Sequence, residues 1–189
     1  MSKLLGDLAA FGNTHDSDAA NRGTRMLNIT PETGDFLAVL VKAMGARRIL
    51  EVGTSNGYST LWLAEAAGSA GSVTTIERSA AKIAMASANF AQAGLATRIE
   101  QREGDAGEIL RGLADEAYDL LFLDSLRSAY LDWWPDLKRV LRKGGLLVVD
   151  NASSHPEEMA GFTAVVRADS DFTTSLVPVG KGEFLAVKA

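Results

Sequence analysis

The stretch that most constrains the fold of this chain is RRILEVGTSNGYSTLWLAEA, residues 47–66. An apolar run breaks at Glu51, passes the glycines Gly53 and Gly57, and continues as a segment whose apolar residues have helical spacing. A strand, a tight turn and a helix in this order predict the first unit of an open α/β sheet, which binds ligands beyond the carboxyl ends of its strands. Gly53 would allow a sharp turn, and Gly57 would let backbone approach a ligand. The alternative is a tight turn that binds nothing.

The rest of the chain alternates in the same way between apolar runs and helical patterns. Strands are predicted at residues 47–52, 72–77, 97–103, 118–124 and 145–150. Helices are predicted at residues 30–45, 59–67, 79–94 and 128–145. Thr30 and Ser79 are expected N-caps, and Pro135 should kink the last helix or start a second one. Strands that alternate with helices predict a parallel sheet covered on both faces.

The C-terminal segment 171–189 departs from this rhythm, because two β-like runs are separated by GKG at residues 180–182. This pattern predicts a hairpin, so the sheet should end in an antiparallel C-terminal edge strand. The predicted fold class is therefore α/β, with a Rossmann-like, doubly wound, mostly parallel seven-stranded sheet and helices on both faces. We expect a single domain over residues 1–189, with an N-terminal helical cap segment at 1–45 and a Rossmann-like core at 46–189.

Composition narrows the class of protein. The 189 residues are 47% hydrophobic and 23% charged, with a net charge of -5 and no basic cluster, which suits one soluble globular domain rather than a binder of long nucleic acids. The absence of cysteine excludes disulfides, thiolate metal sites and a cysteine nucleophile. No segment has the pattern of a signal peptide or of a bilayer span, so we expect no membrane partner and, by default, a cytoplasmic location.

Two acids indicate which ligand the first turn would bind. Glu77 ends the second predicted strand, where an acid suits the two hydroxyls of a ribose. Glu51 interrupts an apolar strand end and, once buried, needs a partner, either an ammonium group on the ligand or donors in the turn. The spacing E-x-G-x-x-x-G lacks the tight glycine pair with which dinucleotide-binding turns contact a pyrophosphate. The pattern therefore favours S-adenosylmethionine over a nicotinamide dinucleotide.

Five segments, ILEVGTSNGYST, TTIE, GDAGEIL, YDLLFLDSLRSAY and LRKGGLLVVDN, together resemble the class I O-methyltransferases. The branch is that of the catechol and caffeoyl-CoA O-methyltransferases and their small bacterial relatives, and the resemblance runs from Met26 to the C-terminus. It implies that S-adenosylmethionine is bound, with Glu77 on its ribose and Asp105 and Ala106 along its adenine. It also implies that the methionine part is held by the first turn and helix, through Glu51, Gly53, Ser55, Gly57, Tyr58 and Ser59. MLNITPETG resembles the family segment that closes over cofactor and substrate.

The fourth and fifth predicted strands each end in an acid, Asp124 in the first case and Asp150, followed by Asn151, in the second. Neighbouring parallel strands would bring these side chains to one edge of the sheet, beside the cofactor, so Asp124 is a candidate cofactor-binding residue as well. Two carboxylates and an amide oxygen fit Mg²⁺. The resemblance implies a divalent cation here that chelates a vicinal diol. The alternative is that Asp124 caps a helix and that Asp150 and Asn151 start a turn.

Two residues near these acids are candidate catalytic groups. Arg127 stands where the resembled family usually carries a Lys that acts as general base. Because arginine stays protonated, it is a poor base, and it would instead stabilise a phenolate, pair with a substrate carboxylate or lie on a helix surface. His155 would take a proton or reach the metal, or else cap a helix. Trp133 and Trp134 either line a binding site for an aromatic acceptor or pack the predicted helix 128–145 against the sheet.

The function that these features favour is transfer of a methyl group from S-adenosylmethionine to a phenolic or catechol-type hydroxyl of a small molecule, assisted by a divalent cation. One alternative is an NAD-dependent oxidoreductase, which Glu77 suits and the glycine spacing does not. Another is a non-catalytic protein that binds S-adenosylmethionine, which Arg127 in place of Lys permits. The sequence does not identify the acceptor. The resemblance also implies a homodimer.

Overall fold

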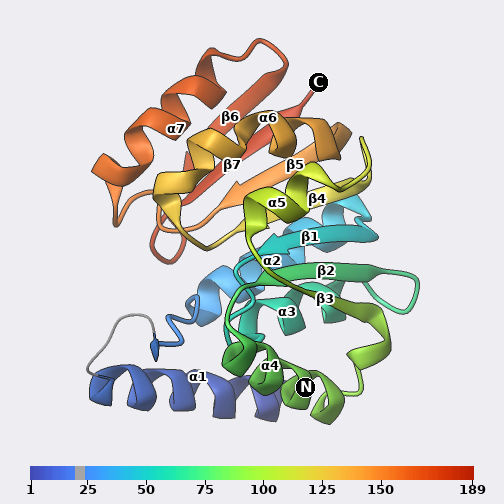
Figure 1. Cartoon of the computed structure of the whole chain (residues 1–189), viewed down its shortest axis with the longest axis vertical. Helices are drawn as coiled ribbons and strands as arrows, with labels where there is room; N and C mark the ends of the chain where they lie inside the picture. The colour runs from blue at the N-terminus through green and yellow to red at the C-terminus, as the bar shows by residue number, and fades with distance from the viewer. Residues whose placement is uncertain (20–23) are drawn as a thin grey trace.

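The computed structural model describes residues 1–19 and 24–189, in which a seven-stranded sheet is flanked by helices (Figure 1). The strand order is β3-β2-β1-β4-β5-β7-β6, and the pairs from β3 through to β5 are parallel. The order reverses between β1 and β4, which places a ligand-binding crevice at their carboxyl ends. The strands are β1 Arg48–Val52, β2 Ser72–Glu77, β3 Ile99–Glu103, β4 Tyr118–Leu123, β5 Leu141–Val149, β6 Phe172–Val177 and β7 Glu183–Lys188.

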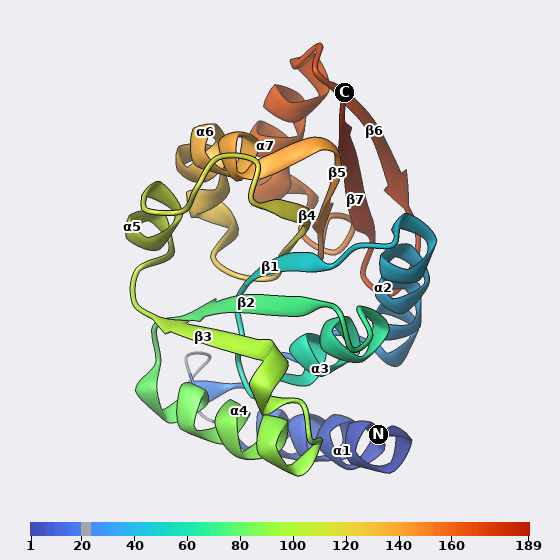
Figure 2. The same ribbon diagram turned by 90° about the vertical axis from the view of Figure 1, so that its right-hand side faces the viewer.

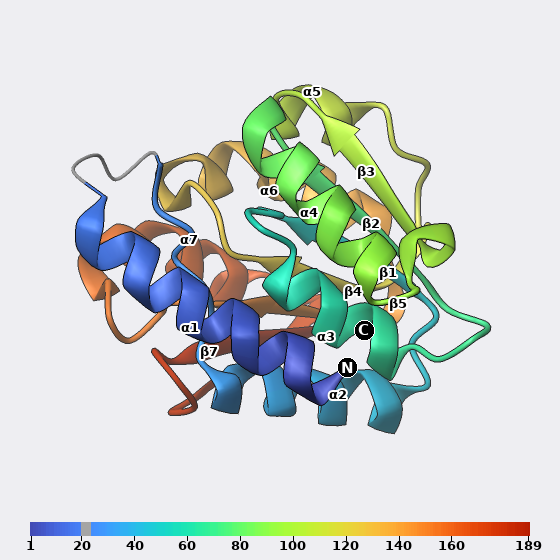
Figure 3. The same ribbon diagram turned by 90° about the horizontal axis from the view of Figure 1, so that it is seen from below.

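Helices cover both faces of this sheet, as predicted, and Figure 2 shows β3 and the β6–β7 hairpin at its two ends. Helices α1 to α4 share a core with one face, and α5 to α7 share a core with the other. Figure 3 shows α1 as the outermost of the first group, lying against α3. The helices are α1 Ser2–Asp18, α2 Pro31–Met44, α3 Tyr58–Ala66, α4 Ala80–Gln92, α5 Ala106–Arg111, α6 Tyr130–Val140 and α7 Pro156–Ala168, with 3-10 turns η2 Ala96–Arg98 and η3 Arg127–Ala129.

The central strands are buried on successive residues, which explains why they are apolar without alternation. Every residue of β4 is buried, and so are the last four of β1. On one face, Phe122 belongs to the same core as Phe90 of α4, and on the other Leu121 belongs to the same core as Tyr130 of α6. Burying both faces of these strands removes large apolar areas from water and fixes the sheet that carries the site.

Local signals set the helix starts that were predicted. Thr30 precedes α2, its Oγ1 accepts a hydrogen bond from the Thr33 N–H at 3.2 Å, and Pro31 occupies the first turn. Ser79 caps α4 in the same way, accepting from the Lys82 N–H at 3.4 Å. None of the helices in the described part of the chain is long and apolar enough to cross a membrane.

The C-terminal hairpin is present, but its strands are arranged differently from the prediction. β7, the last strand, is the antiparallel one and lies between β5 and β6, so the edge of the sheet is β6. The chain leaves α7, forms the outer strand first, and then returns through residues 180–182 into the remaining gap beside β5. The prediction of an antiparallel strand in this hairpin is correct, and its place at the edge is wrong.

Helix α6 also differs from its predicted extent. It passes through Pro135 as a single helix and ends at Val140, because Leu141 takes an extended conformation, is buried and begins β5. Trp134 holds the helix on α7 through an edge-to-face contact with Phe162, with ring centroids 5.7 Å apart. Helices α5 and α7 were not among the predicted segments, although Pro156 in the first turn of α7 is a signal for a helix start.

Candidate active site

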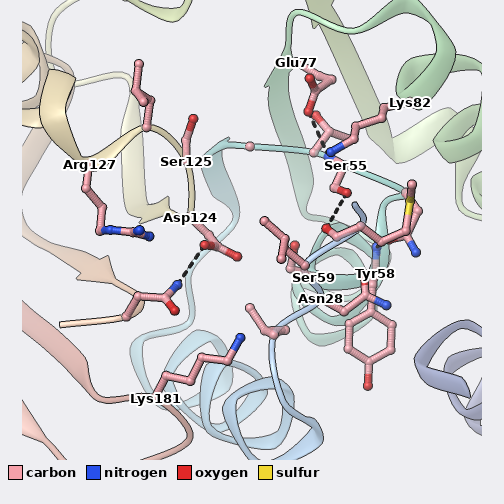
Figure 4. Close-up of a pocket in the computed structure, with 18 of the residues that line it drawn as sticks. Asn28, Ser55, Tyr58, Ser59, Glu77, Lys82, Asp124, Ser125, Arg127 and Lys181 are labelled. Carbon is pink, nitrogen blue, oxygen red and sulfur yellow. Dashed lines mark hydrogen bonds between the residues drawn. The ribbon is translucent and has the colours of Figure 1, made fainter. Parts of the chain in front are cut away.

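A cavity of about 800 Å³ opens at the carboxyl ends of β1, β2, β4 and β5 (Figure 4). It is bordered by the β1–α3 turn, the segment before α2, the segments that follow β4 and β5, and the β6–β7 hairpin. The predicted site residues that line it are Gly53, Ser55, Tyr58, Ser59, Glu77, Asp124, Arg127, Asn151 and His155. Glu51, Gly57 and Asp150 lie behind this lining, and a second, smaller cavity adjoins it.

The β1–α3 turn has a backbone that only particular residues can adopt. Gly53 has φ +110°, and a Cβ on it would lie 2.1 Å from the carbonyl oxygen of Asp124. Gly57 has φ +85°, and its Cβ would lie 2.4 Å from the ring of Phe90. Ser55 takes φ +48° without being glycine, and its Oγ donates a 2.7 Å hydrogen bond to the carbonyl of Met26. The turn therefore packs against β4 and α4 and ties down the segment before α2.

Glu51 is fully buried and has its partners inside the protein. Its carboxylate accepts hydrogen bonds from Ser59 Oγ at 2.5 Å, from Thr75 Oγ1 at 2.6 Å and from Thr60 Oγ1. Burial raises the pKa of Glu51 to about 7, against the opposing effect of these three donors. Of the two partners considered from the sequence, donors beside the turn are the ones observed. Glu51 holds the start of α3 on β1 and β2.

Glu77 lies at the end of β2 and organises the backbone around it. Its Oε2 accepts from the Ser55 N–H, and its Oε1 accepts from the N–H groups of Arg78 and Ser79, each at 3.0 Å. Asn56, which sequence reasoning missed, is buried in the wall of the cavity, and its Nδ2 has no hydrogen-bond partner among the described residues. This buried Nδ2 is therefore available to donate a hydrogen bond to an oxygen of a ligand in the cavity.

The second cavity, of about 100 Å³, shares Glu77 with the first. Asp105 and Ala106 line it, as does the ring of Trp133. Asp105 also caps α5, accepting from the Glu108 N–H at 3.0 Å. Trp133 therefore lies in the cavity that Asp105 lines, while Trp134 packs in the core.

The acids that end β4 and β5 converge, as predicted. The Asn151 Nδ2 donates to Asp124 Oδ1 at 3.1 Å and to Asp150 Oδ2 at 2.8 Å, and the Asn151 N–H donates to Asp150 Oδ1 at 2.6 Å. Asn151 has φ +67°, a conformation that asparagine tolerates better than most residues. Burial and the charge of Asp150 raise the pKa of Asp124 to about 8, with Lys181 and Arg127 opposing the rise.

A third carboxyl group, missed by sequence reasoning, adjoins this pair. Glu183 is fully buried at the start of β7 and accepts a 3.0 Å hydrogen bond from Thr33 Oγ1. Burial, followed by the charge of Asp150 beside it, raises the pKa of Glu183 to about 9. Within residues 1–19 and 24–189, no group of three or more histidine, cysteine, aspartate or glutamate side chains is arranged to hold a metal ion. Any metal here would therefore also depend on the amide of Asn151 and on ligand oxygens.

Both candidate catalytic residues line the cavity on the side of Asp124. The Nε of Arg127 donates a 2.8 Å hydrogen bond to Glu158 Oε2, and the arginine side chain is only 9% exposed. The Nδ1 of His155 lies 2.9 Å from Ser154 Oγ. The cavity wall is completed by Lys181 from the β6–β7 hairpin, which sequence reasoning did not single out.

Comparison with known proteins shows which family has this arrangement. The family model described as O-methyltransferase matches residues 13–189. A catechol O-methyltransferase of Mycobacterium tuberculosis is 38% identical over 154 residues, which cover 79% of this chain and 68% of the relative. A catechol O-methyltransferase of Niastella koreensis is 35% identical over 156 residues, covering 80% and 70%. The chain belongs to the O-methyltransferase family.

Solved structures of this family show that the likeness extends to the whole fold. An O-methyltransferase from Bacillus cereus in complex with SAH (S-adenosylhomocysteine) has a TM-score of 0.85 at 26% identity, covering 99% of this chain and 91% of the other. TomG from Streptomyces achromogenes, in complex with SAM (S-adenosylmethionine), has a TM-score of 0.82 at 28% identity, covering 98% and 89%. The protein is a class I S-adenosylmethionine-dependent O-methyltransferase. This assignment disfavours both alternatives raised from the sequence, an NAD-dependent oxidoreductase and a non-catalytic protein that binds S-adenosylmethionine.

In this O-methyltransferase, Glu77 provides a direct test of the cofactor site. We expect Glu77→Gln to weaken binding of S-adenosylhomocysteine about tenfold, because a charged acceptor of hydrogen bonds would be replaced by a neutral amide. Isothermal titration calorimetry measures the affinity. Glu103→Gln is the matched control, since Glu103 ends the adjacent strand β3, pairs with Glu77 in the sheet register and is exposed. Equal affinities for the two variants would contradict a role of Glu77 in cofactor binding.

Proposed function

We propose that this O-methyltransferase methylates a phenolic, catechol-type hydroxyl of a small molecule, with a divalent cation such as Mg²⁺ held by Asp124, Asp150 and Asn151. The observation that carries the proposal is the convergence of these three side chains beside the cavity, which Asp124 and Asn151 line together with the β1–α3 turn. The names of the two catechol O-methyltransferases support the acceptor class.

The chemistry of the acid cluster fits a cation. Asp124 and Asp150 are close enough for the charge of one to raise the pKa of the other, and Glu183 adds a third carboxyl group. Such a buried excess of carboxylates is stabilised when a positive charge joins it. Carboxylate and amide oxygens are ligands that Mg²⁺ prefers, with water or a diol completing its shell. The Asn151 Nδ2 faces both acids here, so Asn151 would have to turn its Oδ1 towards the cation. When bound, the cation would lower the pKa of an acceptor hydroxyl, and S-adenosylmethionine would supply the methyl group on a sulfonium.

The residues beside the cluster have separate proposed roles. Arg127 keeps its charge and is oriented by Glu158, so we assign it to positioning of the acceptor rather than to proton removal. His155 contacts Ser154 through Nδ1, so its Nε2 is the proposed acceptor of the hydroxyl proton. Gly53, Ser55, Asn56 and Glu77 would hold the cofactor on the other side of the cavity, with Asp105 and Ala106 near its adenine.

Calorimetric titration of Mg²⁺ into protein saturated with S-adenosylhomocysteine and catechol tests the cation. We expect the parent to bind Mg²⁺ and Asp150→Ala to bind it at least about tenfold more weakly, because one of two carboxylate ligands is lost. Asp132→Ala is the control, since Asp132 is an exposed acid on α6 outside both cavities. A parent that binds no Mg²⁺ would refute the metal site, and one that methylates no catechol or phenol would refute the acceptor class.

Two broader expectations complete the proposal. The homodimer implied by the resemblance is testable by size-exclusion chromatography with light scattering, where twice the chain mass is expected. The expected cytoplasmic location stays a prediction.

A further inference from the structure

The turn of the β6–β7 hairpin is built to present one side chain, that of Lys181. The two flanking glycines have positive φ, +54° at Gly180 and +91° at Gly182. A Cβ on Gly180 would lie 2.1 Å from Thr33 Oγ1, and one on Gly182 would lie 2.0 Å from Ser153 Oγ. Neither position has room for a larger residue, so the path of the turn is fixed by close packing against α2 and against the segment after β5.

Backbone hydrogen bonds join this turn to the segment that follows Asp150 and Asn151. The carbonyl of Lys181 accepts from the N–H groups of Ser153 and Ser154, both at 3.1 Å, and the carbonyl of Gly182 accepts from the Ala152 N–H at 2.9 Å. The position of Lys181 is thereby tied to the strand end that carries two of the proposed metal ligands.

The Lys181 side chain extends from this turn towards Asp124, and Arg127 approaches Asp124 from another direction (Figure 4). The positive charge of Lys181 offsets part of the rise in the pKa of Asp124, which also indicates their proximity. Within the described residues, the Lys181 ammonium has no hydrogen-bond or ion-pair partner, whereas the Arg127 guanidinium is held by Glu158. The other ionisable groups near this end of the cavity belong to Asp150, Glu183, Glu51, Glu158 and His155.

We propose that Lys181 is a catalytic residue whose ammonium donates a hydrogen bond to the nucleophilic oxygen of the acceptor and stabilises it as an oxyanion. The inference rests on the proposed function, which places the acceptor hydroxyl at the Asp124 end of the cavity. An ammonium with three donors and no protein partner is suited to an anionic oxygen.

In the reaction that this contact assists, the acceptor O–H bond breaks and its proton passes to His155. An oxygen lone pair then forms the O–CH₃ bond while the S–CH₃ bond breaks, and its electron pair stays on sulfur. The oxyanion and the sulfonium become a neutral ether and a neutral thioether. Because the negative charge on oxygen disappears as the bond forms, Lys181 acts by increasing the fraction of acceptor that is ionised at the start.

The test compares Lys181→Met and Lys181→Arg with the parent, and uses Lys143→Met, an exposed lysine on β5, as control. The probe is 4-nitrocatechol, whose ionisation changes its visible absorption, bound with S-adenosylhomocysteine in the presence and absence of Mg²⁺. We expect Lys181→Met to raise the pKa of the bound phenol by about 1 unit, as loss of a neighbouring opposite charge does. We also expect kcat for catechol to fall about tenfold at pH 7, with Lys181→Arg retaining most of it. Affinity for S-adenosylhomocysteine should not change, which shows that the variants are folded.

Three results would overturn the inference in distinguishable ways. An unchanged pKa of bound nitrocatechol together with an unchanged kcat removes Lys181 from catalysis and leaves the proposed function intact. A rise in KM alone would make Lys181 a binding residue for some other part of the acceptor. If the parent neither binds nitrocatechol nor methylates any catechol, the proposed function fails and the inference fails with it.

Discussion

Gly53→Ala should abolish measurable binding of S-adenosylhomocysteine and lower the free energy of unfolding by about 4 kcal/mol. Two costs combine in this variant. The backbone at Gly53 has φ +110°, which side chains other than glycine rarely adopt, and the added Cβ would lie 2.1 Å from the carbonyl oxygen of Asp124. Relief requires that the β1–α3 turn and the end of β4 move apart, and residues of both segments line the cavity. Chemical denaturation and calorimetry measure the two effects.

Gly45→Ala is the matched control for that experiment. Gly45 ends α2 with φ +62°, and a Cβ there would meet no atom within 4 Å. This variant has the cost of a left-handed backbone without the collision, so we expect it to lose about 1 kcal/mol and to bind the cofactor normally. Equal losses in the two variants would show that the contact between Gly53 and Asp124 contributes nothing.

The fold was largely predictable because its signals are local or periodic. The apolar runs of β1, β4 and β5 are long enough to require cover on both faces, and Thr30 and Ser79 mark helix starts through hydrogen bonds to residues three positions away. The place of β7 was not predictable in this way. A hairpin fixes that β6 and β7 are neighbours, but which of them pairs with β5 depends on contacts between distant segments, such as Val148 with Leu185.

The residues of the candidate site also fall into two groups, those that local sequence signals predicted and those that depend on the placement of β7. Asp124, Asp150 and Asn151 were found because each ends a strand, and parallel strand ends meet at one edge. Glu183 and Lys181 were missed because each lies near a strand start, where the antiparallel direction of β7 brings it to that same edge. A correct placement of β7 inside the sheet would have predicted both.

For Glu51, the sequence predicted that the carboxylate is buried but not which group is its partner. Its place in an apolar strand end predicted a buried carboxylate that needs a partner, and both a ligand ammonium and neighbouring donors satisfied that requirement. The structure has three hydroxyl donors, from Ser59, Thr60 and Thr75. Two come from the first turn of α3 and one from β2, so the carboxylate joins three elements under the cofactor turn instead of contacting the cavity directly.

The protein without cofactor or metal should lose stability as the pH rises, and Glu51 should account for a large part of the loss. Its pKa is raised from an ordinary value of 4.5 to about 7, so between these values the folded chain binds more protons than the unfolded chain. Stability contributed by this group is therefore fully present below pH 4.5 and is lost as the pH rises through 7. The shift corresponds to about 3 kcal/mol.

Urea denaturation between pH 5 and pH 8, in a buffer with a metal chelator, measures that loss. Glu51→Gln removes the titrating group and keeps an acceptor for the surrounding hydroxyls. Between pH 5 and pH 8 its stability should therefore fall by about 2.5 kcal/mol less than that of the parent. The remaining slope should reflect Asp124 and Glu183, whose pKa values are raised as well. Glu65→Gln, at an exposed position on α3, should follow the parent. Identical pH dependence in the parent and in Glu51→Gln would mean that the three hydroxyl donors already stabilise a charged carboxylate in the folded protein.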